Sequence, residues 1–317
     1  MKQLPSLVWN EFLKLMRQPG SIVMIGLIAL ILLGGAILDR NFNDSKNVGG
    51  ENWEAELQEQ NENIQEKLDN GEFSMFGPDK IEENNFRIEN DLAIPEGGNA
   101  WTFTRENAEA TSIVLMFTVI IAASIVSNEF KWGTIKMLLI RPISRSTILL
   151  SKFLTVLLYG LVTLLAFFLF NFLIGAIFYG VDQLGSLHVY QTADGYETIS
   201  NAKVTFVSYL TLLGNLMVFG TLAFMISTIF RSNAMAIALS IFLFLTGGTL
   251  GALVSRFDWG KYVIFTNTNL KGYFDYFFAQ PYYDDQTLMF SLITLAIYSI
   301  IFYASGWLFF TKRDVAS

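Results

Sequence analysis

Residues 127–152 read SNEFKWGTIKMLLIRPISRSTILLSK and lie between two long apolar runs. The segment holds one acid, Glu129, against five basic residues, which are Lys131, Lys136, Arg141, Arg145 and Lys152. Loops on the cytoplasmic side of a membrane retain Lys and Arg, so this pattern predicts a cytoplasmic loop between two membrane spans. Helix-compatible spacing from Phe130 to Arg141 predicts a short surface helix, and Pro142 ends it because the residue before a proline is disfavoured in helical geometry. A partner protein is expected to dock on this short helix.

The composition is that of an integral membrane protein. Of the 317 residues, 52% are hydrophobic and 15% are charged, whereas a soluble domain has about 25% charged residues. The absence of cysteine excludes disulfides and thiolate chemistry, and the single histidine, His188, excludes a multi-histidine metal cluster. The net charge of −7 is unevenly distributed, because residues 39–108 hold 17 acids and 6 bases. Such asymmetry predicts that this segment lies in a different compartment from the basic loop.

Six apolar runs are long enough to cross a bilayer, which takes roughly 20 residues. The runs lie at 21–38, 110–127, 153–178, 204–229, 234–254 and 287–310. The predicted fold is therefore an all-α integral membrane protein with six transmembrane helices. Basic residues in alternate connections, together with the absence of an evident cleaved signal, predict a multi-pass protein of a bacterial plasma membrane with both termini cytoplasmic.

The segments outside the spans have predicted roles of their own. Residues 1–20 are expected to form a cytoplasmic interfacial helix, or else an extension of the first span. Residues 39–109 are expected to form a small acidic, helical extracellular domain, whose acids either attract cations or are an ordinary solvated surface. The remaining divisions are the loop at 128–152 and the region 153–317, with extracellular loops at 179–203 and 255–286. The last loop is rich in Tyr and Phe, which predicts short helices that dip into the outer leaflet, or an aromatic belt.

Several kinds of chemistry are absent from the sequence. No stretch matches GxxxxGK[ST], so the chain has no P-loop and is not expected to be an enzyme. None of the six predicted spans contains an ionisable residue, which argues against a proton relay, a voltage sensor or an intramembrane protease. Asn171 and Asn215 are the most polar residues in the spans, and interhelical hydrogen bonding is favoured for them over ligand binding. Transport by such a chain requires energy from a partner.

One motif points to that partner. The pattern Glu-Phe-x-x-Gly-Thr-Ile-x-x-Leu-Leu, followed by Arg-Pro-Ile-Ser-Arg directly after the second of six spans, resembles the cytoplasmic coupling helix of the permeases of type-2 ABC exporters. The resemblance covers nearly the whole chain, from the interfacial helix to the aromatic loop before the last span. It implies a pair of permease chains, identical or related, that works with two copies of an ABC ATPase subunit. ATP and Mg would be bound by that ATPase, with no cofactor in this chain, and no nucleic-acid partner is expected.

The resemblance also assigns residues. The implied ATPase-coupling residues are Glu129, Phe130, Gly133, Thr134, Arg141, Pro142 and Arg145. Among them, Glu129 and Arg145 are expected to contact the ATPase, or else to anchor the loop at lipid headgroups. The implied substrate path lies between the second and fifth spans of two subunits, and its candidate residues are Thr118, Ser124, Phe242, Phe244, Thr246 and Thr249. Such a lining favours an amphipathic substrate, for example a peptide antibiotic or a lipid-like molecule. Gly247 and Gly251 have the spacing that permits close helix contact.

Two functions from different classes stay open. The first is the transmembrane permease subunit of an ABC exporter, with its energy supplied by a separate ATPase. The second is a membrane sensor or immunity module, in which the acidic extracellular domain binds a peptide and a partner ATPase serves signalling or detoxification. Neither the substrate, the direction of transport, the identity of the ATPase nor the choice between homodimer and heterodimer follows from the sequence.

Overall fold

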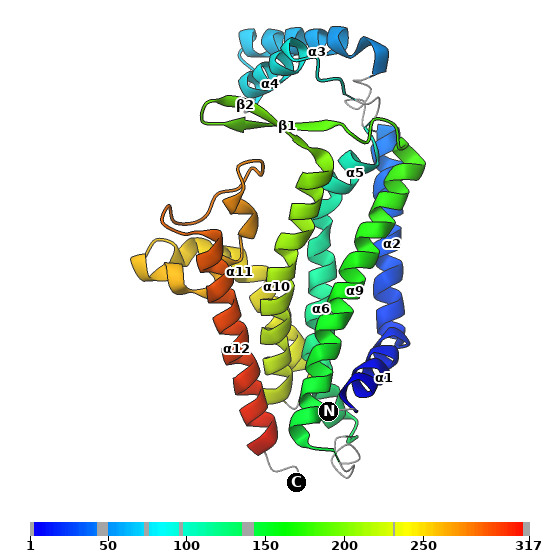
Figure 1. The fold of residues 1–317 in the computed structure, drawn as a ribbon, viewed down its shortest axis with the longest axis vertical. Coiled ribbons are helices and arrows are strands. Elements are labelled where there is room, and N and C mark those ends of the chain that lie inside the picture. Colours follow the sequence, from blue (N-terminus) through cyan, green and yellow to red (C-terminus); the bar gives the residue numbers. More distant parts are fainter. Residues whose placement is uncertain are drawn as a thin grey trace.

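The computed structural model describes residues 3–42, 50–72, 76–94, 98–134, 143–230 and 232–312. Its long helices run side by side, and both chain termini lie at the same end of the bundle (Figure 1). We call this the terminal end. Four elements at the opposite end form what we call the distal module, namely α3 (Trp53–Asp69), α4 (Gly77–Glu89), β1 (Leu187–Thr192) and β2 (Gly195–Ser200). The predicted coupling residues Arg141 and Pro142 fall outside the described residues.

Six helical stretches of the described chain are long and apolar enough to span a membrane, which confirms the predicted number. They are Pro19–Leu38, Ala100–Ser124, Arg145–Tyr179, Asn201–Ile229, Asn233–Val254 and Leu288–Lys312. The corresponding elements are α2 (Pro19–Phe42), α5 (Ala100–Glu106) with η3 (Asn107–Ala110) and α6 (Thr111–Ser124), α9 (Arg145–Tyr179), α10 (Asn201–Ile229), α11 (Asn233–Val254) and α12 (Leu288–Lys312). The third of these begins eight residues before the predicted run, so it includes Lys152.

Local sequence signals explain several helix ends. The first helix, α1 (Leu4–Met16), stops just before Pro19, which then opens α2 because its fixed φ suits a first helical turn. At the start of α9, the Ser144 hydroxyl accepts a hydrogen bond from the Thr147 N–H at 3.1 Å and so caps the helix. Gly180, with φ of 79°, ends α9 in a conformation that favours glycine.

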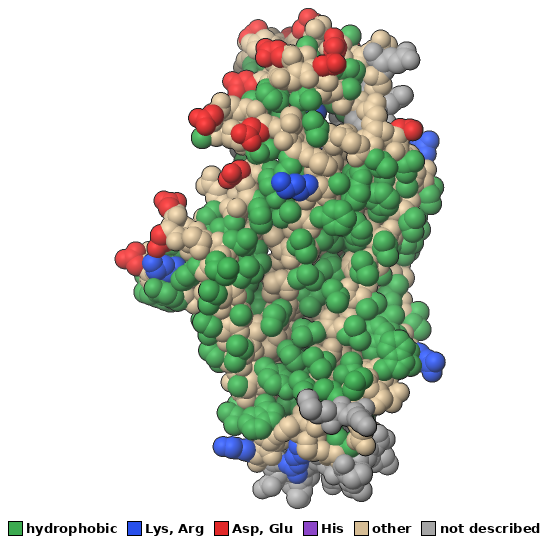
Figure 2. Space-filling view, in the orientation of Figure 1, with side chains coloured by type: hydrophobic (Ala, Val, Ile, Leu, Met, Phe, Trp, Pro, Cys, Tyr) green, Lys and Arg blue, Asp and Glu red, His purple; other side chains and the backbone are tan. Residues whose placement is uncertain are grey.

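The centre of the bundle is α10, which contacts α6, α9, α11 and α12. Of the most apolar 18-residue stretch of α10, 67% is buried inside the structure, whereas only 17% of the corresponding stretch of α11 is buried. Exposed apolar side chains on α2, α11 and α12 therefore face outward, as expected for helices in contact with lipid or with another chain. Figure 2 shows this apolar surface along the length of the bundle, with acidic side chains gathered over the distal module.

The predicted all-helical fold is incomplete, because residues 187–200 form a β-hairpin. The strands β1 and β2 are antiparallel, with Leu187 opposite Ser200 and Thr192 opposite Gly195. Two residues thus connect the strands, and Gly195 has φ of 130°, which is strained for any residue with a side chain. The hairpin continues directly into α10 and packs beside α4.

The connection between α11 and α12 folds back onto the bundle. It contains three short helices, which are η4 (Asp258–Tyr262), η5 (Ile264–Asn267) and η6 (Leu270–Tyr273). The Asn267 amide donates hydrogen bonds to the carbonyls of Lys261 and Val263, at 2.9 and 2.7 Å. A side-chain β-carbon at Gly251 would lie 2.9 Å from the Phe265 carbonyl oxygen. The two spaced glycines of α11 thus make room for η5 of the same chain.

Candidate functional site

A break in the second span precedes the predicted coupling helix. Residues 132–134 form a turn, so the helix predicted from Phe130 to Arg141 is interrupted there, and residues 135–142 lie outside the described residues. α6 ends at Ser124, and the short α7 (Ser127–Lys131) begins three residues later. The Ser227 hydroxyl of α10 accepts hydrogen bonds from the N–H groups of Val126 and Ser127, at 3.1 and 3.0 Å. A buried N–H group without a partner would cost about 1–3 kcal/mol, so Ser227 stabilises the break and fixes where α7 begins.

Four charged side chains meet beside this break, and we call them the ion cluster: Glu11, Lys14, Glu129 and Lys152. The Lys152 Nζ lies 2.9 Å from a carboxylate oxygen of Glu129 and 2.9 Å from one of Glu11. The Lys14 Nζ lies 2.9 Å from the same oxygen of Glu129. Only 2% of the Lys152 side chain and 4% of the Glu129 side chain are exposed. The ion cluster therefore joins α1, α7 and α9 through paired charges.

The electrostatics of Glu129 follow from this pairing. Burial alone would raise the pKa of its carboxyl group, but the charge of Lys152 and hydrogen bonds from Thr134, Lys152 and Lys14 outweigh burial and lower it to about 2. Thr134 donates to the carboxylate oxygen that the lysines do not contact. Glu129 is thus ionised at neutral pH, and both of its oxygens are occupied. Removing one member of a buried ion pair typically costs about 3–5 kcal/mol.

Some of the predicted coupling residues lie in the interior of the structure, and others lie at its surface. Glu129 is buried, so direct contact with a partner does not fit its position, and its role here is to hold α7. Phe130 packs against the core, and Gly133 has φ of 70°, which suits glycine at the turn after α7. Arg145 donates from Nη1 to the Thr311 carbonyl at 3.3 Å and so links α9 to α12. Lys131, Trp132 and Gly133 are exposed, and of these three only Gly133 was among the predicted coupling residues.

The predicted path residues do not gather around one cavity within this chain. Thr118 and Ser124 are buried in α6, and their hydroxyls donate to carbonyls of the same helix. On α11, Phe242 and Thr249 are exposed. The other two residues of α11, Phe244 and Thr246, are half-buried, and Phe244 makes an edge-to-face contact with Phe219 of α10. A path that includes all six residues would need a second chain beside α11.

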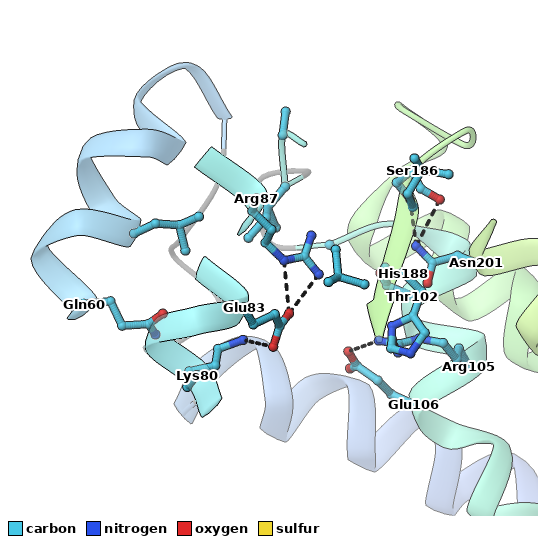
Figure 3. A pocket seen from close by; sticks show the side chains of 16 residues that line it. Gln60, Lys80, Glu83, Arg87, Thr102, Arg105, Glu106, Ser186, His188 and Asn201 are labelled. Atoms are coloured by element: carbon cyan, nitrogen blue, oxygen red, sulfur yellow. Dashed lines mark hydrogen bonds and ion pairs between the residues drawn. The ribbon is translucent and has the colours of Figure 1, made fainter. Parts of the chain in front are cut away.

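A cavity of about 470 Å³ lies between the distal module and the bundle, and we call it the distal cavity. Two groups of charged side chains face each other across it (Figure 3). On α4, Glu83 pairs with Lys80 at 2.9 Å and with Arg87 at 3.0 Å. On the bundle side, the Arg105 Nη1 lies 2.7 Å from the His188 Nδ1, and the Arg105 Nη2 lies 3.4 Å from a Glu106 oxygen. The sequence analysis did not predict this cavity.

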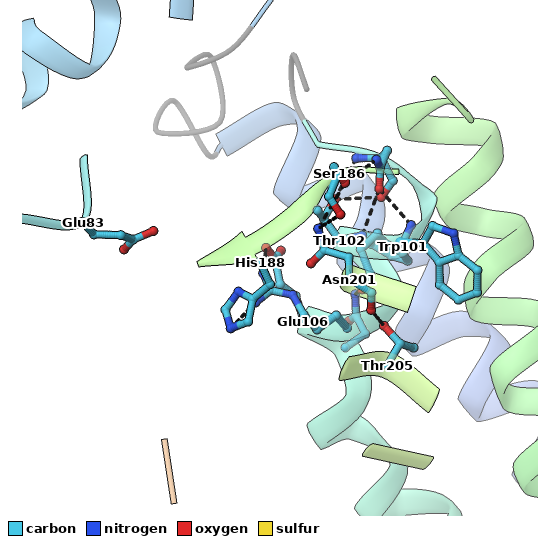
Figure 4. A network of polar contacts seen from close by, with 12 residues as sticks. Glu83, Trp101, Thr102, Glu106, Ser186, His188, Asn201 and Thr205 are labelled. Carbon is cyan, nitrogen blue, oxygen red and sulfur yellow. Dashed lines mark hydrogen bonds and ion pairs between the residues drawn. The ribbon is translucent and has the colours of Figure 1, made fainter. Parts of the chain in front are cut away.

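The floor of the distal cavity is a polar network at the start of α5. The Asn99 side chain accepts hydrogen bonds from the N–H groups of Trp101 and Thr102, at 3.0 and 3.1 Å, and so caps the helix. Its amide donates to the Ser186 hydroxyl at 3.0 Å, and the Asn201 amide donates to the same hydroxyl at 3.1 Å (Figure 4). These contacts fix the ends of α5 and α10 against the chain that leads into β1.

The imidazole of His188 is neutral at the cavity wall. Burial, followed by the positive charges of Arg105 and Arg87, lowers the pKa of His188 to about 4. Since a guanidinium only donates, the Nδ1 atom of His188 accepts the hydrogen bond and the ring proton lies on Nε2. No group of three or more His, Cys, Asp or Glu side chains in the described part of the chain is arranged to hold a metal ion.

The comparisons with known proteins agree with a membrane location. The family described as "Protein of unknown function (DUF2705)" matches residues 74–316. The chain is 38% identical to the uncharacterized protein YhcI of Bacillus subtilis (strain 168) over 317 residues, which cover 98% of this chain and 99% of the relative. It is 32% identical to the uncharacterized membrane protein YdbK of the same organism over 204 residues, which cover 62% of this chain and 76% of the relative. With its six candidate spans, the chain is a multi-span membrane protein with bacterial relatives.

Proposed function

We propose that this chain, which belongs to the family of unknown function DUF2705, is the membrane-spanning permease subunit of an ABC exporter. The observation that carries the proposal is the ion cluster, in which Glu129 joins α7 to Lys14 of α1 and Lys152 of α9. A short element held this firmly between two spans, at the basic end of the molecule, has the properties that a coupling element needs. A separate ATPase supplies the energy, and ATP and Mg bind to that partner.

The mechanism is a rigid-body transmission of force. A push on α7 acts on α6 through the short Ile125–Val126 connection, and on α1 and α9 through the ion cluster. Paired buried charges resist separation, so the three helices move together and do not bend one by one. Rotation of such a body against the rest of a bundle is a common form of two-state transition.

The partner contact falls on the exposed end of α7. Trp132 is 56% exposed although it is large and apolar, and Lys131 beside it is also exposed. Aromatic residues are enriched where proteins bind one another. In this proposal Lys131 and Trp132 touch the ATPase, while Glu129 holds them in position.

The charge distribution supports the orientation. Figure 2 shows basic side chains at the terminal end and acidic side chains over the distal module. Cytoplasmic segments retain Lys and Arg, so both termini and α7 lie in the cytoplasm and the distal module lies outside the cell. The exposed face of α11, with Phe242 and Thr249, then pairs with a second permease chain, and an amphipathic substrate passes between them.

The test is copurification of an ATPase with the tagged full-length chain from its own host membranes in mild detergent. The expected result is a copurified P-loop protein, identified by mass spectrometry, that hydrolyses ATP in the eluate. Trp132→Ala should remove most of that activity. Trp259→Ala is the matched control, because Trp259 is 59% exposed but lies in the connection between α11 and α12. Absence of any ATPase from the wild-type eluate would contradict the permease function.

A second function, the sensor or immunity module, is favoured by the distal cavity. Its volume of about 470 Å³ is typical of ligand pockets, and charged and polar side chains line it. Inside-out vesicles separate the two functions, because only an exporter accumulates substrate in them when ATP is added. A chain that binds its ligand and assembles with an ATPase, yet fills no vesicle, would be the sensor.

A further inference from the structure

The distal cavity has the size of a small-molecule site. Its volume of about 470 Å³ falls within the range of roughly 300–1,000 Å³ that is typical of ligand pockets. Its walls come from α3, α4, α5, β1 and the first residue of α10, so distant parts of the sequence combine to form it. Sites formed in this way, between a module and the body of a protein, are a frequent location for ligands.

The charges that line the cavity are not balanced internally. Among the described residues that line it, Lys80, Arg87 and Arg105 contribute three positive charges, whereas Glu83 and Glu106 contribute two negative ones. Glu83 is already paired with both Lys80 and Arg87. The cavity is therefore a cationic site beneath a distal module whose outer surface is acidic (Figure 2).

Arg105 has donors that the protein does not use. A guanidinium carries five N–H donors. One nitrogen, Nη1, faces the neutral ring of His188, and Nη2 makes a 3.4 Å contact with Glu106. The third nitrogen, Nε, is buried and has no hydrogen-bond partner among the residues that the structure describes. A guanidinium with free donors in this arrangement is suited to bidentate contact with a carboxylate or a phosphate.

A second buried group, the side chain of Asn201, requires a hydrogen-bond donor, whereas Arg105 requires an acceptor. Asn201 lines the cavity and is 2% exposed. Its amide donates to the carbonyl and the hydroxyl of Ser186, both at 3.1 Å, but its Oδ1 atom has no partner in the described part of the chain. Buried polar atoms are paired in nearly all native proteins, and an exception calls for an explanation. The unpaired oxygen is an acceptor, so it calls for an N–H or O–H group.

We infer that the distal cavity binds a small ligand that carries an oxyanion beside an N–H or O–H donor, with Arg105 on the oxyanion and Asn201 on the donor. A short peptide with a free C-terminus has this chemistry, and so does a phosphorylated amino acid. The inference does not depend on the proposed function, because it concerns the chain without its ATPase.

The test is isothermal titration of the full-length chain in nanodiscs with two pairs of probes. One pair is N-acetyl-trialanine and its C-terminal amide, and the other is the N-acetyl amide of O-phospho-L-serine and the N-acetyl amide of L-serine, so that the members of each pair differ by a single oxyanion. We expect one of the two anionic probes to bind with a stoichiometry of one, and its neutral counterpart to bind about 10- to 100-fold more weakly, as the loss of charge-assisted hydrogen bonds predicts. The pair that responds identifies the source of the oxyanion. Failure of both anionic probes to bind would overturn the inference.

Variants of Arg105 localise the binding. Arg105→Gln should weaken the anionic probe about 10- to 100-fold, and Arg105→Lys, which keeps the charge but loses the fork of donors, should weaken it to a smaller extent. Arg256→Gln is the matched control, since Arg256 is exposed and outside the cavity. The unfolding temperature without ligand shows that each variant is folded, and Arg105→Lys decides the question if Arg105→Gln does not fold. Binding that is equal in the Arg105 variants and the control would exclude this site.

Discussion

The ion cluster and the distal cavity differ in how completely their buried charged groups are paired. In the ion cluster, two lysines meet two glutamates, and both oxygens of Glu129 accept hydrogen bonds. In the distal cavity, Arg105 faces a neutral histidine, and its Nε atom lacks a partner within the described ranges of the chain. Fully paired buried charges hold elements together, whereas unpaired donors are available to a ligand. The terminal end of the molecule is therefore built for fixed geometry, whereas we infer a binding role for the distal end.

The largest expected effect is that of Lys152→Met, which breaks the ion cluster at its most buried member. The variant leaves Glu11 and Glu129 side by side without the ammonium group between them, so the free energy of unfolding should fall by about 3–5 kcal/mol. Thermal unfolding of the purified chain in nanodiscs measures the change. Lys131→Met, at an exposed lysine of α7, is the control and should stay within about 0.5 kcal/mol of wild type. Equal losses in the two variants would mean that the ion cluster does not fix the geometry.

The second expected effect is the pH dependence that Glu129 confers. Its pKa is about 2 in the folded chain, against 4.5 for the unperturbed group. Because the folded-state pKa is depressed, the stabilisation is complete above pH 4.5 and is lost as the pH falls towards 2. The full contribution is on the order of 3 kcal/mol. Unfolding of wild type and Glu129→Gln should differ most between pH 5 and 7 and converge near pH 2, and a constant difference over that range would contradict the assignment.

Arg105→Gln tests the other half of the comparison. Without ligand, the free energy of unfolding should change by about 1 kcal/mol or less, since the variant loses one hydrogen bond to a neutral ring and one long contact. With the anionic probe at about 100 times its dissociation constant, wild type should gain about 2.7 kcal/mol and the variant should gain much less. Ligand-free destabilisation as large as that of Lys152→Met would show that Arg105 is structural.

The sequence predicted some elements of the fold and missed others, and the physical reason differs between elements. The six spans were predictable because each is a local apolar run. The break between α6 and α7 was not predictable in this way, because Ile125 and Val126 are apolar and lie inside the predicted run 110–127. The hairpin was missed although its signals were local, with Asp194-Gly195 at the turn and an alternating pattern around the buried Val189. Its strands are only six residues each, and they lie within the predicted extracellular loop at 179–203.

The two polar sites needed tertiary information. Glu11, Glu129 and Lys152 come from segments far apart in the chain, and nothing in their spacing shows that they meet. Glu129 was identified as important because of its motif, but the motif does not show whether a charged side chain is buried. The distal cavity has no motif at all, since its walls come from five elements. Burial and pairing are properties of the fold, and they decide whether a charge fixes an element or binds a partner.

Lys14→Met has the smallest expected effect, and it tests whether burial or charge gives the ion cluster its strength. Lys14 makes the same 2.9 Å contact with Glu129 as Lys152 does, but 46% of its side chain is exposed. Water competes for an exposed ammonium group, and Lys152 still neutralises Glu129 after the change, so the free energy of unfolding should fall by about 1 kcal/mol or less. Unfolding measured in 0.05 M and 1 M salt should show that this small contribution is screened, while the Lys152 contribution persists. If Lys14→Met destabilised the chain as much as Lys152→Met, the number of contacts to Glu129 would set the strength of the ion cluster, and the contrast between paired and unpaired buried charge would lose its physical basis.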